Sequence, residues 1–165
     1  MKIAFTGPES SGKTTLATWF ANTYQLPLSV EFARNYLEME PNYEFADLDR
    51  ICEGQLSDWA KLGNAFVADT EMTVIKIWSE YRFHDLSTLI FKEYAEQQFD
   101  HYFLCAPDIP WEEDPLRENP DNRDELFDIY LSELTQMKRP FTVLSGSLSQ
   151  RQKVCQMVMN GLLNA

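Results

Sequence analysis

A short string near the N-terminus carries residue types that bind phosphate. Gly7, Gly12, Lys13 and Thr14 stand at the fixed positions of the pattern G-x-x-x-x-G-K-[ST], directly after the apolar run Ile3-Ala4-Phe5. Glycines at this spacing let backbone N–H groups turn toward phosphate oxygens, and the helix behind them adds a positive N-terminal dipole. The lysine can then reach the β- and γ-phosphates, and the threonine hydroxyl can ligate Mg²⁺. The string therefore predicts a phosphate-binding loop, called the P-loop below.

A carboxylate follows a second apolar run. Asp69 comes directly after Phe66-Val67-Ala68, as expected of a strand that ends at the acid holding Mg²⁺ in P-loop proteins. Since ligands bind at the carboxyl ends of parallel strands, Asp69 should face Lys13 and Thr14. Its alternative role is the N-cap of the helix that follows. Thr14 and Asp69 are thus the predicted metal ligands.

Another predicted strand, 28–32, contains Glu31 at its end, and Arg34, of opposite charge, follows it. A carboxylate at this edge of the sheet could accept the proton of a hydroxyl group on a phosphoryl acceptor. Either Glu31 or Asp69 could be that base. Arg34 could bind phosphate, or it could form a structural ion pair with Glu31.

A proline-rich segment separates two predicted elements. Four prolines between Cys105 and Asp121 exclude a helix there, acidic residues cluster around Trp111, and Arg117 and Arg123 follow. Arginines on a closing lid can stabilise the charge of a transferring phosphoryl group and exclude water from it. We therefore predict a lid at about 107–123. A solvated acidic loop is the alternative with the same composition.

The last predicted strand, 141–145, leads into Ser145 and Gly146. The loop at this place holds the adenine in many such folds, so these two residues are candidates for contact with the base. A plain strand-to-helix turn explains them equally well. Arg151, further along, is one of the few arginines that could hold an anionic nucleotide, or it lies only on the surface of the helix that follows.

Short apolar runs alternate with amphipathic stretches along the chain, which is typical of a parallel sheet covered by helices on both faces. We expect strands near 2–6, 28–32, 65–69, 101–105 and 141–145, and helices near 12–24, 47–62, 71–80, 86–98, 121–138 and 148–162. In the second helix Ile51, Gln55 and Trp59 recur at a spacing of four residues, so this face is buried or lines a site. Asp47 is its predicted N-cap.

Length and charge limit the class of protein. The 165 residues fit one domain, predicted as residues 1–165. A net charge of −12 argues against a broad surface for nucleic acid or for an anionic membrane. No apolar stretch approaches the roughly 20 residues of a bilayer span, and the chain enters the P-loop strand at once, which leaves no room for a signal peptide. We therefore expect a cytoplasmic protein with neither nucleic-acid nor membrane partners. The sequence does not determine its oligomeric state.

The cysteines are odd in number and widely spaced. Cys52, Cys105 and Cys155 fit neither a disulfide framework nor a paired zinc site. We predict that all three are small buried apolar side chains.

These segments together resemble one family, the P-loop kinases related to the nicotinamide riboside kinase domain of NadR proteins. The resemblance covers almost the whole chain and rests on the order and spacing of its motifs. They are Gly7 to Thr15 with Glu9-Ser10-Ser11, Glu31 to Arg34, Gln55, Asp69-Thr70 with Thr73 and Trp78, Asp108 to Trp111 with Asp114 and Arg117, and Arg123.

The resemblance implies an α/β P-loop NTPase fold, a three-layer sandwich around a five-stranded parallel sheet of order 2-3-1-4-5, with a lid. It also implies transfer of phosphate from ATP, bound with Mg²⁺, to the 5′-hydroxyl of nicotinamide riboside. The implied catalytic residues are Lys13, Glu31, Asp69, Arg117 and Arg123, and Glu9, Ser10, Ser11 and Thr15 join the nucleotide-binding set. The implied riboside-binding residues are Glu31, Arg34, Gln55, Trp59, Asp108 and Trp111. The adenylyltransferase and repressor parts of NadR have no counterpart here, so we expect neither DNA binding nor dinucleotide synthesis.

Two alternatives stay open. The acceptor could be another nucleoside or a small metabolite. From a different class, the chain could be a nucleotide-dependent switch or sensor that controls a protein partner. The sequence lacks the N-K-x-D string with which Ras-type GTPases read guanine, and lid arginines opposite Glu31 favour an enzyme that uses an acceptor.

Overall fold

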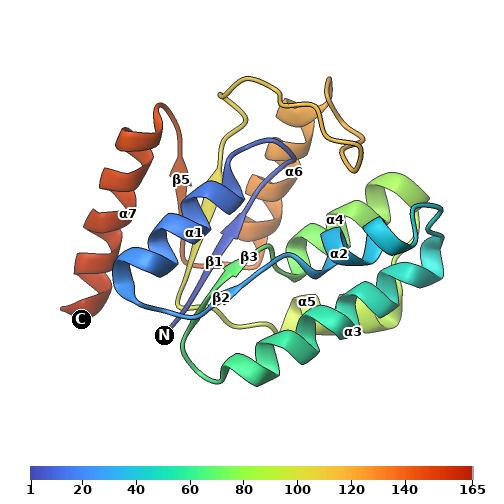
Figure 1. Ribbon diagram of the computed structural model, residues 1–165, viewed down its shortest axis with the longest axis horizontal. Helices are drawn as coiled ribbons and strands as arrows, with labels where there is room; N and C mark the ends of the chain where they lie inside the picture. The colour runs from blue at the N-terminus through green and yellow to red at the C-terminus, as the bar shows by residue number, and fades with distance from the viewer. Residues whose placement is uncertain (165) are drawn as a thin grey trace.

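The computed structural model describes residues 1–164 and contains a five-stranded parallel sheet with helices on both faces (Figure 1). The strands follow the spatial order β2-β3-β1-β4-β5, which confirms the order expected from the sequence. They are β1 (Lys2–Thr6), β2 (Leu28–Ser29), β3 (Phe66–Asp69), β4 (His101–Cys105) and β5 (Phe141–Leu144). The helices are α1 (Lys13–Tyr24), α2 (Phe32–Met39), α3 (Phe45–Leu62), α4 (Met72–Phe83), α5 (Thr88–Glu96), α6 (Arg123–Gln136) and α7 (Leu148–Leu163).

β1 lies at the centre of the sheet because it is apolar on both faces. Ile3 is paired with Val67 of β3 on one side and with His101 of β4 on the other. Ile3 and Phe5 pack with α1 and α7, whereas Ala4 packs on the opposite face with α4 and α6. Strands buried on both faces form continuous apolar runs. This is why the sequence located β1, β3, β4 and β5 within one residue of their observed ends.

Helices α2 to α5 form a separate apolar cluster beyond the β2–β3 side of the sheet (Figure 1). Its centre contains Leu48, Ile51, Met72 and Ile90, which are at most 1% exposed. This cluster fixes the helices that stand opposite the P-loop. None of the helices within residues 1–164 is long and apolar enough to cross a membrane.

The second strand is shorter than expected, and helix α2 was not expected at all. β2 ends at Ser29, and α2 begins at Phe32. The Gln55 side chain explains the change, because its amide nitrogen donates to Ser29 Oγ at 2.8 Å and its oxygen accepts from Phe32 N at 3.0 Å. These bonds replace ladder partners and turn the chain so that Glu31 is the last extended residue before the helix.

Helix α3 begins earlier than predicted. Its N-cap is Glu44, so the prediction of Asp47 as the cap was wrong. Asp47 is the third residue of the helix, and its carboxylate accepts from Glu44 N at 2.7 Å, while the Glu44 side chain accepts from the backbone at Asp47. This reciprocal capping box starts the helix at Phe45, earlier than the predicted start at Asp47.

The prediction for the cysteines is confirmed. Cys52, Cys105 and Cys155 are buried free thiols. Burial raises the pKa of each thiol to about 12. All three are therefore protonated and unreactive at neutral pH.

Candidate active site

The P-loop connects the end of β1 to the start of α1 and takes its shape from residues with positive φ. Gly7 has φ 128° and Gly12 has φ 83°. A Cβ atom at Gly7 would stand 2.6 Å from the carbonyl oxygen of Cys105, so no larger residue fits there without displacing β4. Gly12 is the N-cap of α1 and leaves the first N–H groups of that helix without a side-chain cap. Uncapped N–H groups at a helix N-terminus suit a phosphate.

Lys13 holds the loop together from within. Its Nζ donates to the carbonyl oxygens of Gly7 at 2.9 Å and Pro8 at 2.8 Å. A lysine ammonium has three donors, so one remains for an anion in the concave side of the loop.

Asp69 ends β3 beside the P-loop, as the sequence predicted. Its side chain is 3% exposed, and its Oδ1 is among the buried polar atoms that have no hydrogen-bond partner within residues 1–164. Burial raises the pKa of Asp69, while the Thr14 hydroxyl, Lys13 and Arg34 lower it. A buried carboxylate oxygen without a partner, next to a threonine hydroxyl, is the donor set that Mg²⁺ prefers. Within residues 1–164 no group of three or more histidine, cysteine, aspartate or glutamate side chains is placed to hold a metal ion, so any Mg²⁺ here would take its other ligands from phosphate or water.

Glu31 stands at the end of β2, in extended conformation before α2, and lines the same cavity as Lys13. No hydrogen bond to its carboxylate occurs within residues 1–164. Burial raises the pKa of Glu31 and Asp69 raises it further, whereas Lys13 and Arg34 lower it. Glu31 is therefore a carboxylate that is free to accept a proton.

A cavity of about 750 Å³ joins the P-loop to the helices opposite it. Four aromatic side chains also line it: Tyr43, Trp78, Tyr81 and Tyr130. Tyr43 and Trp78, which belong to the apolar cluster of α2 to α5, are called its aromatic end below. Trp78 Nε1 donates to the hydroxyl of Tyr43 at 3.0 Å, and their rings meet edge to face at 5.0 Å. Tyr43 in turn donates to Glu118 Oε1 at 2.8 Å. The cavity thus has one end built for phosphate and one built for a flat organic group.

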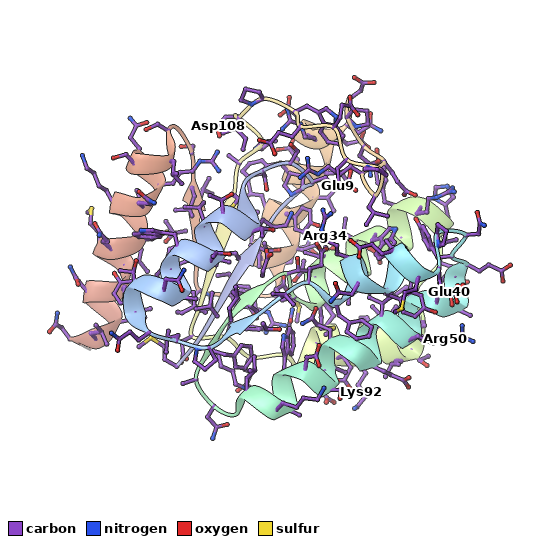
Figure 2. The ribbon with its side chains drawn as sticks, in the orientation of Figure 1. Glu9, Arg34, Glu40, Arg50, Lys92 and Asp108 are labelled. Atoms are coloured by element: carbon purple, nitrogen blue, oxygen red, sulfur yellow. The ribbon has the colours of Figure 1, made fainter. Side chains whose placement is uncertain are left out.

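The lid comprises residues 106–122, between β4 and α6, and it packs on the P-loop. The N–H of Glu112 donates to Ser10 Oγ at 2.9 Å. The carboxylate of Glu9 accepts from the N–H groups of Glu118 and Asn119 at 3.1 and 2.9 Å. Figure 2 shows Glu9 beneath this loop. The prediction of a lid over the phosphate site therefore agrees with the geometry.

The two lid arginines differ in what they reach. Arg117 lines the cavity and donates to the carbonyl oxygen of Glu112 and, at 3.5 Å, to Ser10 Oγ. Arg123 donates to the carbonyl oxygens of Ser10 and Ile109 at 3.1 and 3.0 Å. The ring of Trp111 lies between them, 5.8 Å from one guanidinium carbon and 5.6 Å from the other. Arg117 can act on a phosphoryl group, whereas Arg123 and Trp111 support the loops around it.

Arg34 does not form the ion pair with Glu31 that was one of its two expected roles. Its guanidinium is 2.9 Å from the carboxylate of Asp114 in the lid. It lines the cavity from α2 (Figure 2). Arg34 therefore connects the α2 side of the cavity to the lid.

Four of the six residues predicted to bind the riboside do not line the cavity: Gln55, Trp59, Asp108 and Trp111. Gln55 is 1% exposed, and its side-chain amide is hydrogen-bonded to the turn between β2 and α2. Trp59 packs against Phe66 and Phe99, with ring centroids at 6.0 and 5.3 Å. Gln55 and Trp59 both lie on the buried face of α3. The spacing of four residues therefore predicted a buried face correctly, but the prediction that this face binds the riboside was wrong.

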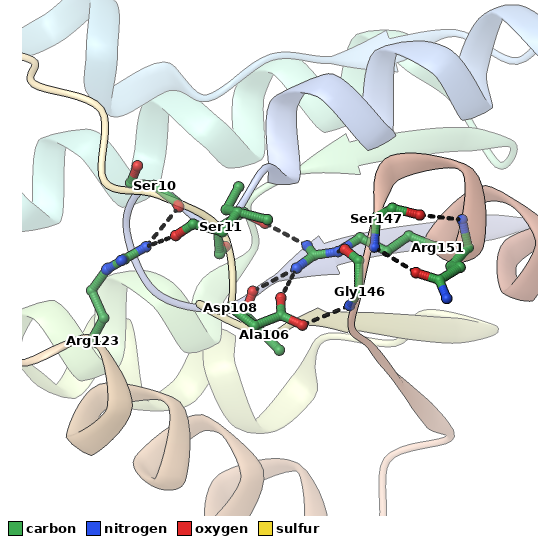
Figure 3. Close-up of polar contacts among 10 residues, drawn as sticks. Ser10, Ser11, Ala106, Asp108, Arg123, Gly146, Ser147 and Arg151 are labelled. Carbon is green, nitrogen blue, oxygen red and sulfur yellow. Dashed lines mark hydrogen bonds and ion pairs between the residues drawn. The ribbon is translucent and has the colours of Figure 1, made fainter.

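Asp108 and Gly146 also do not line the cavity, nor does Ser145. Asp108 Oδ2 accepts from the N–H of Gly146 at 2.6 Å, and its other oxygen is paired with Arg151. Arg151 is 2% exposed, so its interpretation as a surface residue was wrong. Figure 3 shows these residues joined beside the P-loop.

The sequence did not indicate that the aromatic residues of the cavity come together. Tyr43, Tyr81 and Tyr130 come from the α2–α3 connection, α4 and α6, and nothing in their spacing links them. Trp78 alone belonged to the motifs that carried the family resemblance. Only the packing of α4 against both the α2–α3 connection and α6 brings them to one cavity.

Comparisons with known proteins agree with this geometry. A family model described as an AAA domain matches residues 2–151. The trifunctional NAD biosynthesis/regulator protein NadR of Escherichia coli (strain K12) is 32% identical over 127 residues, which cover 70% of this chain and 30% of NadR. The chain thus spans less than a third of the length of this curated relative.

Solved structures share the fold over nearly the whole chain. A NadR protein in complex with NAD and AMP-PNP has a TM-score of 0.79 at 22% identity, covering 96% of this chain and 48% of that one. A NadR protein in complex with NR has a TM-score of 0.75 at 20% identity, with coverages of 96% and 50%. The deoxyadenosine kinase from M. mycoides, with dCMP and dCDP bound, has a TM-score of 0.66 at 16% identity and covers both chains fully.

Proposed function

Since the chain belongs to the AAA-domain family, as a P-loop kinase of the NadR type, we propose that it transfers the γ-phosphoryl group of ATP to the 5′-hydroxyl of nicotinamide riboside. One observation carries the proposal. The P-loop and the free carboxylate of Glu31 line the same cavity of about 750 Å³. A protein that only hydrolysed a nucleotide would not need the aromatic end of that cavity.

The donor side follows from the P-loop. Its backbone N–H groups and Lys13 bind the β- and γ-phosphates, and Arg117 approaches from the lid to stabilise charge on the group in transfer. Thr14 and Asp69 would hold Mg²⁺, which neutralises phosphate charge when bound. The lid packs on Ser10 and Glu9, which excludes water that would otherwise compete with the acceptor.

The acceptor side follows from Glu31. The acceptor oxygen attacks the γ-phosphorus, the bond from this phosphorus to the β–γ bridging oxygen breaks, and ADP leaves. Glu31 takes the hydroxyl proton as the new P–O bond forms. We assign the base to Glu31 rather than Asp69, because the unpartnered oxygen of Asp69 is buried beside Thr14, where it suits a metal.

The acceptor's ring is the reason to prefer nicotinamide riboside. The pyridinium of this riboside is a flat cation, and aromatic faces with nearby carboxylates stabilise such a group. Tyr43 and Trp78 supply the faces, and Glu118 accepts a hydrogen bond from Tyr43 at the same end. The NadR relatives support this choice, since one of their solved complexes contains NR.

An acceptor panel tests the proposal. The purified protein is incubated with Mg-ATP and, separately, nicotinamide riboside, nicotinic acid riboside, adenosine and deoxyadenosine, and both ADP release and product mass are followed. We expect a phosphorylated riboside, with nicotinamide riboside preferred over nicotinic acid riboside, whose carboxylate offsets the ring charge, and over the two neutral nucleosides. Phosphorylation of another acceptor alone would replace the substrate, and ADP release without a phosphorylated product would replace the kinase by an ATPase switch.

A further inference from the structure

Arg151 is a buried charge with four hydrogen-bonding partners. It lies on the first turn of α7 and is 2% exposed. Its guanidinium donates to the carbonyl oxygens of Ser11 at 2.7 Å, Ala106 at 2.9 Å and Gly146 at 3.0 Å, and it is paired with the carboxylate of Asp108. Burying an arginine is costly unless its donors are satisfied, and here most of them are satisfied by loops rather than by helices or strands.

The partners of Arg151 come from the loops that surround the proposed nucleotide. Ser11 belongs to the P-loop, Ala106 and Asp108 begin the lid, and Gly146 follows β5 (Figure 3). Asp108 completes the connection, because its second oxygen accepts from Gly146 N at 2.6 Å. One side chain on α7 thus fixes three loops relative to one another.

The hydrogen bond from Arg151 to the Ser11 carbonyl oxygen also orients the neighbouring N–H group of the P-loop. The carbonyl of Ser11 and the N–H of Gly12 belong to one planar trans peptide, so they point in opposite directions. Holding the Ser11 oxygen on the outer side of the loop therefore directs the Gly12 N–H inward. Arg123 holds the preceding carbonyl, that of Ser10, at 3.1 Å and sets the Ser11 N–H in the same way.

We propose that Arg151, together with Asp108, is a positioning residue for the phosphoryl donor: it keeps P-loop N–H groups directed at the phosphates and ties them to the loop after β5. The inference rests on the proposed function only in taking ATP as the donor. It predicts an effect on donor binding and none on the acceptor, because none of these contacts reaches Glu31 or the aromatic end of the cavity.

The test uses the whole chain with Arg151→Lys, Asp108→Asn and a matched control, Lys76→Met. Lys76 is also a buried, paired cation, 2.8 Å from Glu80 and 2.9 Å from Glu133, but it contacts none of the three loops. Binding of ADP and of inorganic tripolyphosphate is measured by calorimetry, the acceptor KM by assay, and stability by thermal unfolding.

For Arg151→Lys we expect the affinity for ADP and for tripolyphosphate to fall about tenfold or more, with the acceptor KM within about twofold of the wild type. Lys76→Met loses stability and keeps its ADP affinity. Folded Arg151→Lys protein that binds both ligands as the wild type does overturns the inference.

If the Arg151→Lys variant does not fold, the Asp108→Asn variant tests the inference in its place. A several-fold loss of ADP affinity without a lower Tm supports the positioning role, and wild-type affinity overturns it. Wild-type protein that binds ADP but phosphorylates no riboside contradicts the proposed function alone and leaves this inference standing.

Discussion

Arg34 of α2 and Asp114 of the lid form an ion pair of 2.9 Å that connects the acceptor side of the cavity to the loop covering the P-loop. The Arg34 side chain is 43% exposed, so the pair contributes little to stability. The ion pair instead helps to fix the position of the lid over the cavity.

Asp114→Asn should weaken acceptor binding without unfolding the protein. We expect the riboside KM to rise about threefold to tenfold and the free energy of unfolding to change by less than about 1 kcal/mol, because the pair is exposed. The control is Arg50→Gln, which removes an exposed ion pair with Asp47 that does not touch the lid. Steady-state kinetics check the prediction, and an equal KM in both variants contradicts it.

Lys13→Ala should abolish turnover and leave the fold intact. The ammonium stabilises charge on the group in transfer, and removing such a group costs roughly a hundredfold or more in kcat. Its bonds to Gly7 and Pro8 are replaced by water at a cost of about 1 kcal/mol. ADP release and urea unfolding, measured on the same preparation, check both parts, and appreciable turnover by folded variant protein removes Lys13 from the mechanism.

Glu31 should make the reaction sensitive to acid. Burial raises its pKa, so the base becomes protonated at a higher pH than an ordinary glutamate would. We expect kcat to fall as the pH drops through this raised pKa, and Glu31→Gln to lose most activity at every pH. A pH profile of kcat that stays flat down to the ordinary glutamate range would exclude Glu31 as the base.

The same residue should lower stability at neutral pH. With its pKa raised on folding, Glu31 binds protons more tightly in the native state than in the unfolded state. Stability is therefore lost as the pH rises from the ordinary glutamate pKa through the raised one. We expect Glu31→Gln to unfold at a higher temperature than the wild type at pH 7 and at the same temperature well below pH 4, where both side chains are neutral. A Tm of Glu31→Gln below that of the wild type at pH 7 would contradict the raised pKa of Glu31.

Gly7→Ala should destabilise the whole domain, because the added Cβ would stand 2.6 Å from the Cys105 carbonyl oxygen and the backbone has φ 128°. We expect a loss of about 2–4 kcal/mol in the free energy of unfolding. Gly161→Ala is the matched control, since it lies in α7 with no atom within 4 Å of its Cβ position and should gain about 0.5–1 kcal/mol. Urea unfolding of both variants checks the difference in sign.

The sequence predicted the sheet and the donor end of the site better than the acceptor end, for a physical reason. Phosphate binding is local: Gly7 to Thr14 build their loop from consecutive residues, and β3 delivers Asp69 to the same edge. The proposed acceptor end is formed by side chains from α2 to α6, and these residues have no regular spacing in the sequence. Arg151 was misassigned for the same reason, because its partners Ser11 and Ala106 lie far away in the chain.

Tyr43→Phe should affect the acceptor and spare the donor. The hydroxyl accepts from Trp78 at 3.0 Å and donates to Glu118 at 2.8 Å, so it orients the indole ring and the lid carboxylate at the proposed riboside end. Losing it leaves two partners unsatisfied, and we expect the riboside KM to rise about fivefold or more while the ATP KM stays within twofold. Tyr36→Phe is the matched control, because it deletes an equivalent hydroxyl that donates to Asp47 at 2.7 Å and does not line the cavity. Equal riboside KM values in the two variants would show that the aromatic end does not bind the acceptor, even if the P-loop binds ATP as proposed.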